Sequence, residues 1–179
     1  MRCFIAIDLP AEIRNELAEI QNKLPKDSKL IFVNPENIHL TIKFLGEIDD
    51  AKTSKVKEIL KKFQFKQFKA KLSGIGVFPS TSFIRVIWVG IEPKENFVKI
   101  HSLIDKLTSL ENIKIDLNWE NHATLARVKF IKDKKAFQEQ LKKIKINPIE
   151  FTVDNLKLKK STLTPDGPVY EDILEIKMV

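Results

Sequence analysis

The sequence contains one cysteine, five glycines and no long apolar run, and each shortage excludes a class of site or location. The single thiol, Cys3, excludes an internal disulfide and a cysteine-based zinc site, and it fits a reducing, cytoplasmic compartment. No apolar stretch of about 18 residues occurs, so neither a membrane span nor a membrane partner is predicted. The opening segment MRCFIAIDLP meets Asp8 and Pro10 too early for a signal peptide and is predicted to be a strand.

The few glycines do not form a phosphate-binding loop. GIG at 74–76 lacks the third glycine and the following helix of a dinucleotide loop, and no Walker-type loop occurs. The three histidines are dispersed, without the HExxH or CxxC spacings of common zinc sites. The sequence therefore predicts neither a nucleotide cofactor nor a metal.

The composition is that of a basic globular protein. Of 179 residues, 43% are hydrophobic and 31% are charged, which allows a substantial core. No linker or low-complexity segment divides the chain, so we expect one domain over residues 1–179. The formal net charge of +7 favours a polyanionic partner, above all nucleic acid, although basic proteins without such a partner are common.

Hydrophobic periodicity predicts helices and strands in an order that is not a strict βαβ alternation. Helices are predicted at 10–24, 50–63, 94–110 and 133–144, each with one apolar face. Strands are predicted at 2–9, 38–46, 68–78, 83–91, 121–130, 149–163 and 169–179. The pattern indicates an α+β fold with antiparallel or mixed sheets and helices on their outer faces.

The most unusual local feature is a repeated His-x-Thr phrase. HLTI stands at 39–42 and HATL at 122–125, so two of the three histidines precede a threonine by two positions. With eight threonines in the chain, two such hits are expected by chance in fewer than about one chain in a hundred. Each copy lies on a predicted strand that a predicted helix follows, which hints at two related halves.

Strand geometry places the histidine and the threonine of each copy on one face, because residues i and i+2 of a strand point the same way. Leu40 and Ile42 then point into the core behind His39 and Thr41. If the polar faces of the two strands meet, they form a cleft. Lys43 lies an even number of residues after His39, so it is predicted to face this cleft and to add positive charge there.

Two imidazoles and two hydroxyls on facing strands suit the cleavage of a phosphodiester. One histidine can take a proton from water while the other protonates a leaving oxygen, and threonine hydroxyls can donate to the non-bridging oxygens. A strained cyclic phosphate needs no metal in addition. Arg127 follows His122 by five residues, the wrong parity for the same face, so it reaches the anion only through a bulge or from the strand's edge and is otherwise solvated or ion-paired.

The remaining histidine and the tryptophans have structural interpretations. His101 lies between Phe97 and Ile104 on the apolar face of the third predicted helix and is predicted to be structural. Trp88 and Trp119 are predicted to be packing residues, with a base pocket as the alternative.

These segments together resemble the 2H phosphoesterase superfamily, and within it the bacterial and archaeal RNA 2′,3′-cyclic phosphodiesterases, also called 2′-5′ RNA ligases. The likeness runs through MRCFIAIDLP, NPENIHLTIKFLGEI, GVFPSTSFIRVIWVGI, NHATLARVKF and KKSTLTPDGPVYEDI. Two positions depart from the family's pattern: Asn121 stands where proline often precedes the second histidine, and Phe32 stands where tryptophan is frequent. Neither belongs to the acid–base pair.

The resemblance implies a bilobal fold with pseudo-two-fold symmetry and a central cleft between the two motifs. It implies hydrolysis of a terminal 2′,3′-cyclic phosphate of RNA to a 2′-phosphomonoester, without metal or nucleotide cofactor, and 2′-5′ ligation as the reverse reaction. His39 would be the proton donor and His122 the proton acceptor, with Thr41, Thr124 and Arg127 holding the phosphate.

Other functions are compatible with the residues alone. The chain could be a non-catalytic basic RNA-binding module, or a phosphoesterase for another cyclic phosphate or for 2′-5′-linked nucleotides. The residues by themselves do not say which histidine is the acid and which is the base. RNA ends such as those of tRNA fragments are the expected substrates, and a monomer is the expected state.

Overall fold

The fold comprises four α-helices and nine strands over residues 1–179, all of which the computed structural model describes. The strands are β1 (Arg2–Asp8), β2 (Lys29–Phe32), β3 (His39–Glu47), β4 (Phe68–Ser80), β5 (Phe83–Glu92), β6 (His122–Phe130), β7 (Glu150–Val153), β8 (Asn155–Thr164) and β9 (Gly167–Lys177). The helices are α1 (Ala11–Lys23), α2 (Asp50–Lys61), α3 (Lys94–Ser109) and α4 (Lys134–Lys143), and a short 3₁₀ helix, η1 (Pro35–Asn37), precedes β3. The four predicted helices are confirmed to within two residues at each end. No helix combines the length and the apolar character that crossing a membrane requires.

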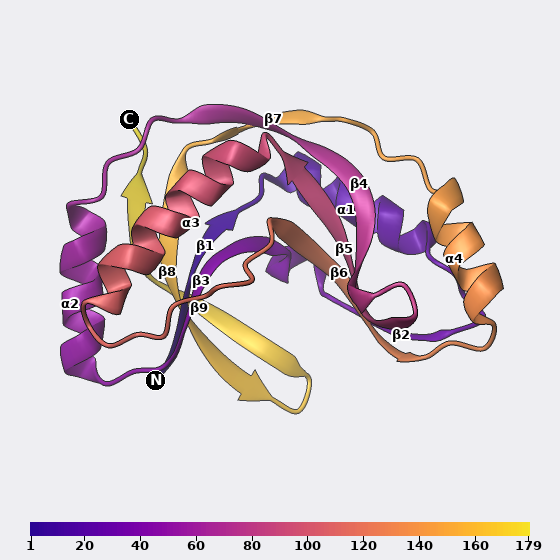
Figure 1. The fold of residues 1–179 in the computed structure, drawn as a ribbon, viewed down its shortest axis with the longest axis horizontal. Coiled ribbons are helices and arrows are strands. Elements are labelled where there is room, and N and C mark those ends of the chain that lie inside the picture. Colours follow the sequence, from indigo (N-terminus) through magenta and orange to yellow (C-terminus); the bar gives the residue numbers. More distant parts are fainter.

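The strands form one antiparallel sheet in the order β7-β4-β5-β6-β3-β1-β8-β9, with β2 beside β6. The α+β class with antiparallel pairing is confirmed. The two expected sheets are continuous with each other, because β3 and β6 pair at one position, Leu40 with Ala123. Figure 1 shows an arch whose two arms meet at β3 and β6, with the β8–β9 hairpin projecting from one arm.

The helices cross from one arm to the other. α1 follows β1 but contacts β6, and α3 follows β5 but contacts β3, so each arm is covered by a helix that starts in the other (Figure 1). Apolar faces of these helices and of the sheet bury one continuous cluster of 37 residues. This shared core fixes the two arms, and therefore β3 and β6, relative to each other.

Helices α2 and α4 begin in the same way, directly after the two His-x-Thr strands. The Asp49 carboxylate accepts a hydrogen bond from the backbone N–H of Lys52 at 2.8 Å, and Asp133 accepts one from Ala136 at 2.9 Å. Each cap satisfies a backbone donor of the first turn and contributes about 1 kcal/mol. The repeated strand–Asp–helix unit is a local expression of the pseudo-two-fold symmetry.

The pairing corrects the prediction for two strands. The run at 149–163 forms two strands, because β7 pairs with β4, whereas β8, after Asp154, pairs with β1 and β9. Strand β2 is absent from the prediction, because its four residues are mostly exposed and carry no alternating pattern. β2 is extended because its backbone pairs with β6, and the burial of its own side chains does not dictate this conformation.

Candidate active site

The two His-x-Thr phrases open two strands that lie side by side in the middle of the sheet. β3 and β6 pair antiparallel through Leu40 and Ala123, whose side chains are fully buried in the core. The residues on either side of this pair point to the opposite face, so each histidine lies beside the threonine of the other strand. All four side chains are partly exposed there. The structure thus brings the two predicted motifs together at the seam between the arms.

A β-bulge follows the threonine of β3. Thr41 pairs with Ala6 of β1 and Lys43 pairs with Ile5, so Ile42 has no partner of its own. A bulge adds one residue to a strand, and the residues beyond it point to the face opposite to the one that regular alternation gives.

The same bulge interrupts β6. Thr124 pairs with Trp88 of β5 and Ala126 pairs with Ile87, which leaves Leu125 without a partner. From their histidines onward, the two strands have the same sequence of buried and exposed positions. The two motifs therefore share their distortion as well as their residues.

The bulge makes the prediction for Lys43 wrong. Its side chain is 1% exposed and lies on the core side of β3, where its ammonium donates to the Asp105 carboxylate and to the Lys114 carbonyl. The same carboxylate accepts from the backbone N–H of Asp116 at 3.1 Å. Lys43 therefore fixes β3 to α3 and to the segment after it, and it adds no charge to the cleft.

The bulge also brings Arg127 to the face that carries His122 and Thr124. Arg127 is exposed and lies on β6 between Ile31 of β2 and Val86 of β5. Burial raises the pKa of Tyr170, and the Arg127 guanidinium counteracts this rise. The Tyr170 ring is 5.3 Å from the His39 ring, edge to face, so Arg127 acts electrostatically on a group that contacts the other motif.

Both imidazoles are held by the same backbone contact. Nδ1 of His39 lies 2.7 Å from the Asn37 carbonyl oxygen, and Nδ1 of His122 lies 2.8 Å from the Glu120 carbonyl oxygen. A carbonyl oxygen can only accept, so Nδ1 carries the proton in both rings. Nε2 is left on each ring for chemistry, and that of His39 lies 2.9 Å from the Thr41 hydroxyl.

The environment favours the neutral form of both rings. Burial lowers the pKa of His39 below its ordinary value of 6.5, and the charges of Lys159 and His122 lower it further, against the Asn37 carbonyl and Asp8. Burial also lowers the pKa of His122, against the carbonyl and the carboxylate of Glu120. Both imidazoles can therefore accept a proton at neutral pH, and an anion beside them would favour the protonated form of one.

Aromatic rings enclose each imidazole. His39 packs against Phe4 at 4.9 Å between ring centroids and against Tyr170, and His122 packs against Phe78 at 4.9 Å and Trp88 at 6.0 Å. Trp88 thus lines the site rather than the core, and its buried indole N–H has no hydrogen-bond partner. Its ring lies over Gly76, where a Cβ would come within 2.0 Å of it.

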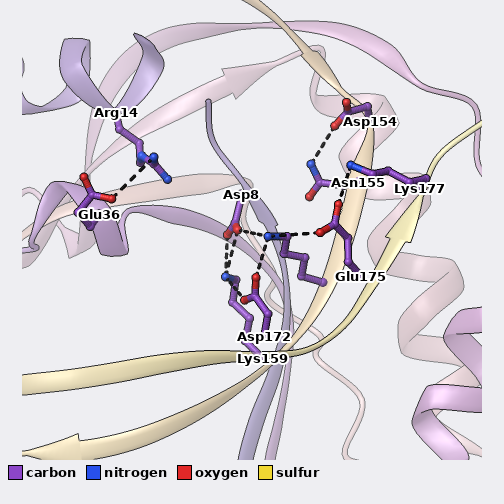
Figure 2. A network of polar contacts seen from close by, with 10 residues as sticks. Asp8, Arg14, Glu36, Asp154, Asn155, Lys159, Asp172, Glu175 and Lys177 are labelled. Carbon is purple, nitrogen blue, oxygen red and sulfur yellow. Dashed lines mark hydrogen bonds and ion pairs between the residues drawn. The ribbon is translucent and has the colours of Figure 1, made fainter. Parts of the chain in front are cut away.

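A hollow of about 350 Å³ adjoins His39. Its walls are mostly charged or polar: Asp8, Glu36, Asn37, Lys159, Tyr170 and Asp172. Lys157 and Lys159 each form ion pairs with both Asp8 and Asp172, and Figure 2 shows this network around the labelled Lys159. This network pairs the Asp8 and Asp172 carboxylates, which line the hollow beside His39, with lysine ammonium groups.

Two residues behind β3 support the bulge. The Trp119 indole donates to the Thr41 carbonyl at 3.0 Å, and Nδ1 of His101 lies 2.8 Å from the Ile42 carbonyl. The two rings stack with centroids 4.5 Å apart. The structural interpretation of His101 and the packing interpretation of Trp119 are confirmed. Asn121 is also buried, and its amide donates to the Ile91 carbonyl.

No cluster of three or more histidine, cysteine, aspartate or glutamate side chains is arranged to hold a metal ion.

The chain is similar to known proteins over nearly its whole length. It is 42% identical to the RNA 2′,3′-cyclic phosphodiesterase of Methanocaldococcus jannaschii, with 98% of this chain and 99% of the relative covered. It is 35% identical to the protein of that name from Thermotoga maritima, with 98% and 94% covered. The crystal structure of a protein from Thermus thermophilus superposes with a TM-score of 0.81 at 27% identity, covering 99% of this chain and 97% of that one.

The family model described as LigT like phosphoesterase matches the chain twice, over residues 7–88 and 89–170. Each match contains one His-x-Thr strand and the helix that follows it. The two matches, the end-to-end relatives and the shared fold agree with one another. The chain is a member of the LigT-like phosphoesterase family.

Proposed function

We propose that this protein is an RNA 2′,3′-cyclic phosphodiesterase that opens a terminal cyclic phosphate to a 2′-phosphomonoester. The observation that carries the proposal is the mirrored pair of imidazoles beside the seam between β3 and β6, each with Nδ1 hydrogen-bonded to a backbone carbonyl and with Nε2 not engaged by the backbone. The full-length relatives that bear this name support the choice of substrate. We include in the proposal that residues 1–179 act as one domain and as a cytoplasmic monomer, on RNA ends such as those of tRNA fragments.

In the proposed reaction, Nε2 of His122 takes a proton from water while the water oxygen forms a bond to phosphorus. The bond from phosphorus to the 3′ oxygen breaks, and the Nε2 proton of His39 passes to that oxygen. This assignment of acid and base follows the family resemblance. Each of the two proton transfers accelerates such reactions by about 10²–10⁴-fold.

Three further side chains bind the anion in this proposal. The hydroxyls of Thr41 and Thr124 donate to non-bridging oxygens, and Arg127 supplies positive charge from beyond the bulge of β6. The bound phosphate also favours the charged imidazolium, which brings the acid into its protonated form although burial lowers its pKa in the free protein. Lys43 has no role here, because it is buried with Asp105.

The proposal is tested by incubating purified protein with an RNA oligonucleotide that ends in a 2′,3′-cyclic phosphate, in the presence of EDTA. We expect full conversion to the 2′-phosphomonoester and the same rate without chelator. A 3′-phosphomonoester as product, or loss of activity with EDTA, would contradict the mechanism. Salt-sensitive RNA binding without turnover would instead identify a binding module, and turnover of other cyclic phosphates or 2′-5′-linked nucleotides alone would change the substrate.

A further inference from the structure

The pseudo-symmetric fold gives the cleft two equivalent exits. Beyond each bulge, the strand leaves the site and leads through an aspartate cap into a helix: Phe44–Ala51 after β3, and Arg127–Lys135 after β6. The first exit carries Glu47, Asp49 and Asp50 and no basic residue. These residues offer a polyanion no attraction, although both exits share the order of bulge, strand end, aspartate cap and helix.

The exit after β6 has the opposite charge. Its basic residues are Arg127, Lys129, Lys132, Lys134 and Lys135, against the single carboxylate of Asp133, which caps α4. All five basic side chains are exposed, and none of them forms an ion pair within the chain. Exposed cations without carboxylate partners are free to bind phosphates and to release their counterions.

The basic exit also carries exposed aromatic rings. Phe130 ends β6 and is 60% exposed, and Phe83 begins β5 and is 57% exposed. Arg127 and Val86 pair across these strands, so both rings lie at the same end of the sheet, and the Arg85 guanidinium lies 5.0 Å from the Phe83 ring. Aromatic faces beside cations bind single-stranded bases by stacking, at about 1–3 kcal/mol per base.

Helix α4 extends this surface. Gln138 donates to the Thr81 carbonyl at 2.5 Å and Lys134 to the Ser82 carbonyl at 2.7 Å, so the helix packs against the turn between β4 and β5. Figure 1 shows α4 and this turn at one end of the molecule and α2 at the other. The strand from Thr124 to Phe130 spans about 20 Å, so the surface begins at the phosphate site and continues well beyond one nucleotide.

From this asymmetry we propose that the RNA strand 5′ to the cyclic phosphate leaves the cleft along the end of β6 and over the start of α4. Its phosphates contact Lys129, Lys132 and Lys135, and its bases stack on Phe130 and Phe83. This inference rests on the proposed function for the position of the RNA end. The charge of the two exits, and not the fold, determines the direction of the strand.

The test replaces Lys129, Lys132 and Lys135 together by glutamine, since none of these side chains makes a hydrogen bond within the chain. For a mononucleoside 2′,3′-cyclic phosphate, kcat/KM should stay within about twofold of wild type. For a cyclic-phosphate RNA of about 16 nucleotides, kcat/KM at low salt should fall about tenfold, and the slope of log affinity against log salt should decrease by about 2.

The matched control replaces Lys61, Lys62 and Lys66 by glutamine; these side chains are likewise exposed and unpaired but lie at the C-terminal end of α2 and in the segment that follows it. This variant should behave like wild type with both substrates. An equal loss with both substrates, no loss with the long RNA, or the same loss in the control would overturn the proposed path. Affinity for the RNA, measured by fluorescence anisotropy, tests the proposed path without depending on hydrolysis. A complete lack of hydrolysis would refute the proposed function and would leave this binding test valid.

Discussion

Replacing His39 or His122 by alanine should each lower kcat/KM for a 2′,3′-cyclic phosphate by about 10²–10⁴-fold. The loss is expected because each ring presents one Nε2 toward the site, fixed by its Nδ1 contact to a carbonyl at 2.7 or 2.8 Å, and alanine has no group that can transfer a proton. Initial rates with a mononucleoside substrate measure the effect without contributions from the RNA strand.

The control for folding is the thermal midpoint of each variant, because His39 also packs against Phe4 and Tyr170. A midpoint that stays well above the assay temperature shows that the loss concerns chemistry. If either alanine variant kept more than about a tenth of wild-type activity, the paired acid–base mechanism would be refuted.

Replacing Asp105 by alanine should lower the free energy of unfolding by about 3–5 kcal/mol. The substitution leaves the Lys43 ammonium, which is 1% exposed, without its carboxylate partner, and it also removes the acceptor of the Asp116 backbone N–H. Chemical denaturation followed by circular dichroism measures the change. The double variant Lys43→Met, Asp105→Leu should recover much of the loss, because no uncompensated charge is then buried.

The matched control is Lys55→Ala, which breaks an ion pair with Glu111 in which the lysine side chain is 59% exposed. Its cost should be much smaller than that of Asp105→Ala, because solvent screens an exposed ion pair. A loss from Asp105→Ala as small as that of the control would refute the structural role of the pair. Unchanged stability of Lys43→Met together with a raised KM for substrate would restore the sequence-based prediction that Lys43 faces the cleft and adds positive charge there.

Much of the site could be predicted from the sequence because it depends on local parity. His39 and Thr41, like His122 and Thr124, precede the bulges, so regular strand alternation places them correctly. Likewise, the helices follow from apolar periodicity and their aspartate caps, which are contacts within one turn.

The remainder depends on contacts between distant segments. The bulges at Ile42 and Leu125 reverse the faces of Lys43 and Arg127, and no residue within the strands marks them. The bulge of β3 is held from outside that strand, for example by Trp119, which lies 78 positions from the Thr41 carbonyl that it contacts. The aromatic enclosure of the imidazoles likewise comes from β1, β4, β5 and β9, whose arrangement only the sheet order reveals. The one signal in the sequence was the repeated His-x-Thr motif itself, which suggests that any distortion of one strand is shared by the other.

The dependence of kcat/KM on pH, compared between wild type and the two single histidine variants, tests the central claim most directly. For wild type we expect a bell with its maximum below about pH 6.5, because burial lowers the pKa of both imidazoles. Activity should fall at higher pH as the acid loses its proton, and at lower pH as the base gains one. The two limbs report macroscopic values of the coupled pair.

The residual activity of His39→Ala should lose the limb at high pH, because no acid remains to be deprotonated. That of His122→Ala should lose the limb at low pH, because no base remains to be protonated. Such profiles would assign the donor to β3 and the acceptor to β6. Both limbs persisting unchanged in either variant would show that the histidines are not the titrating acid and base, and would contradict the account.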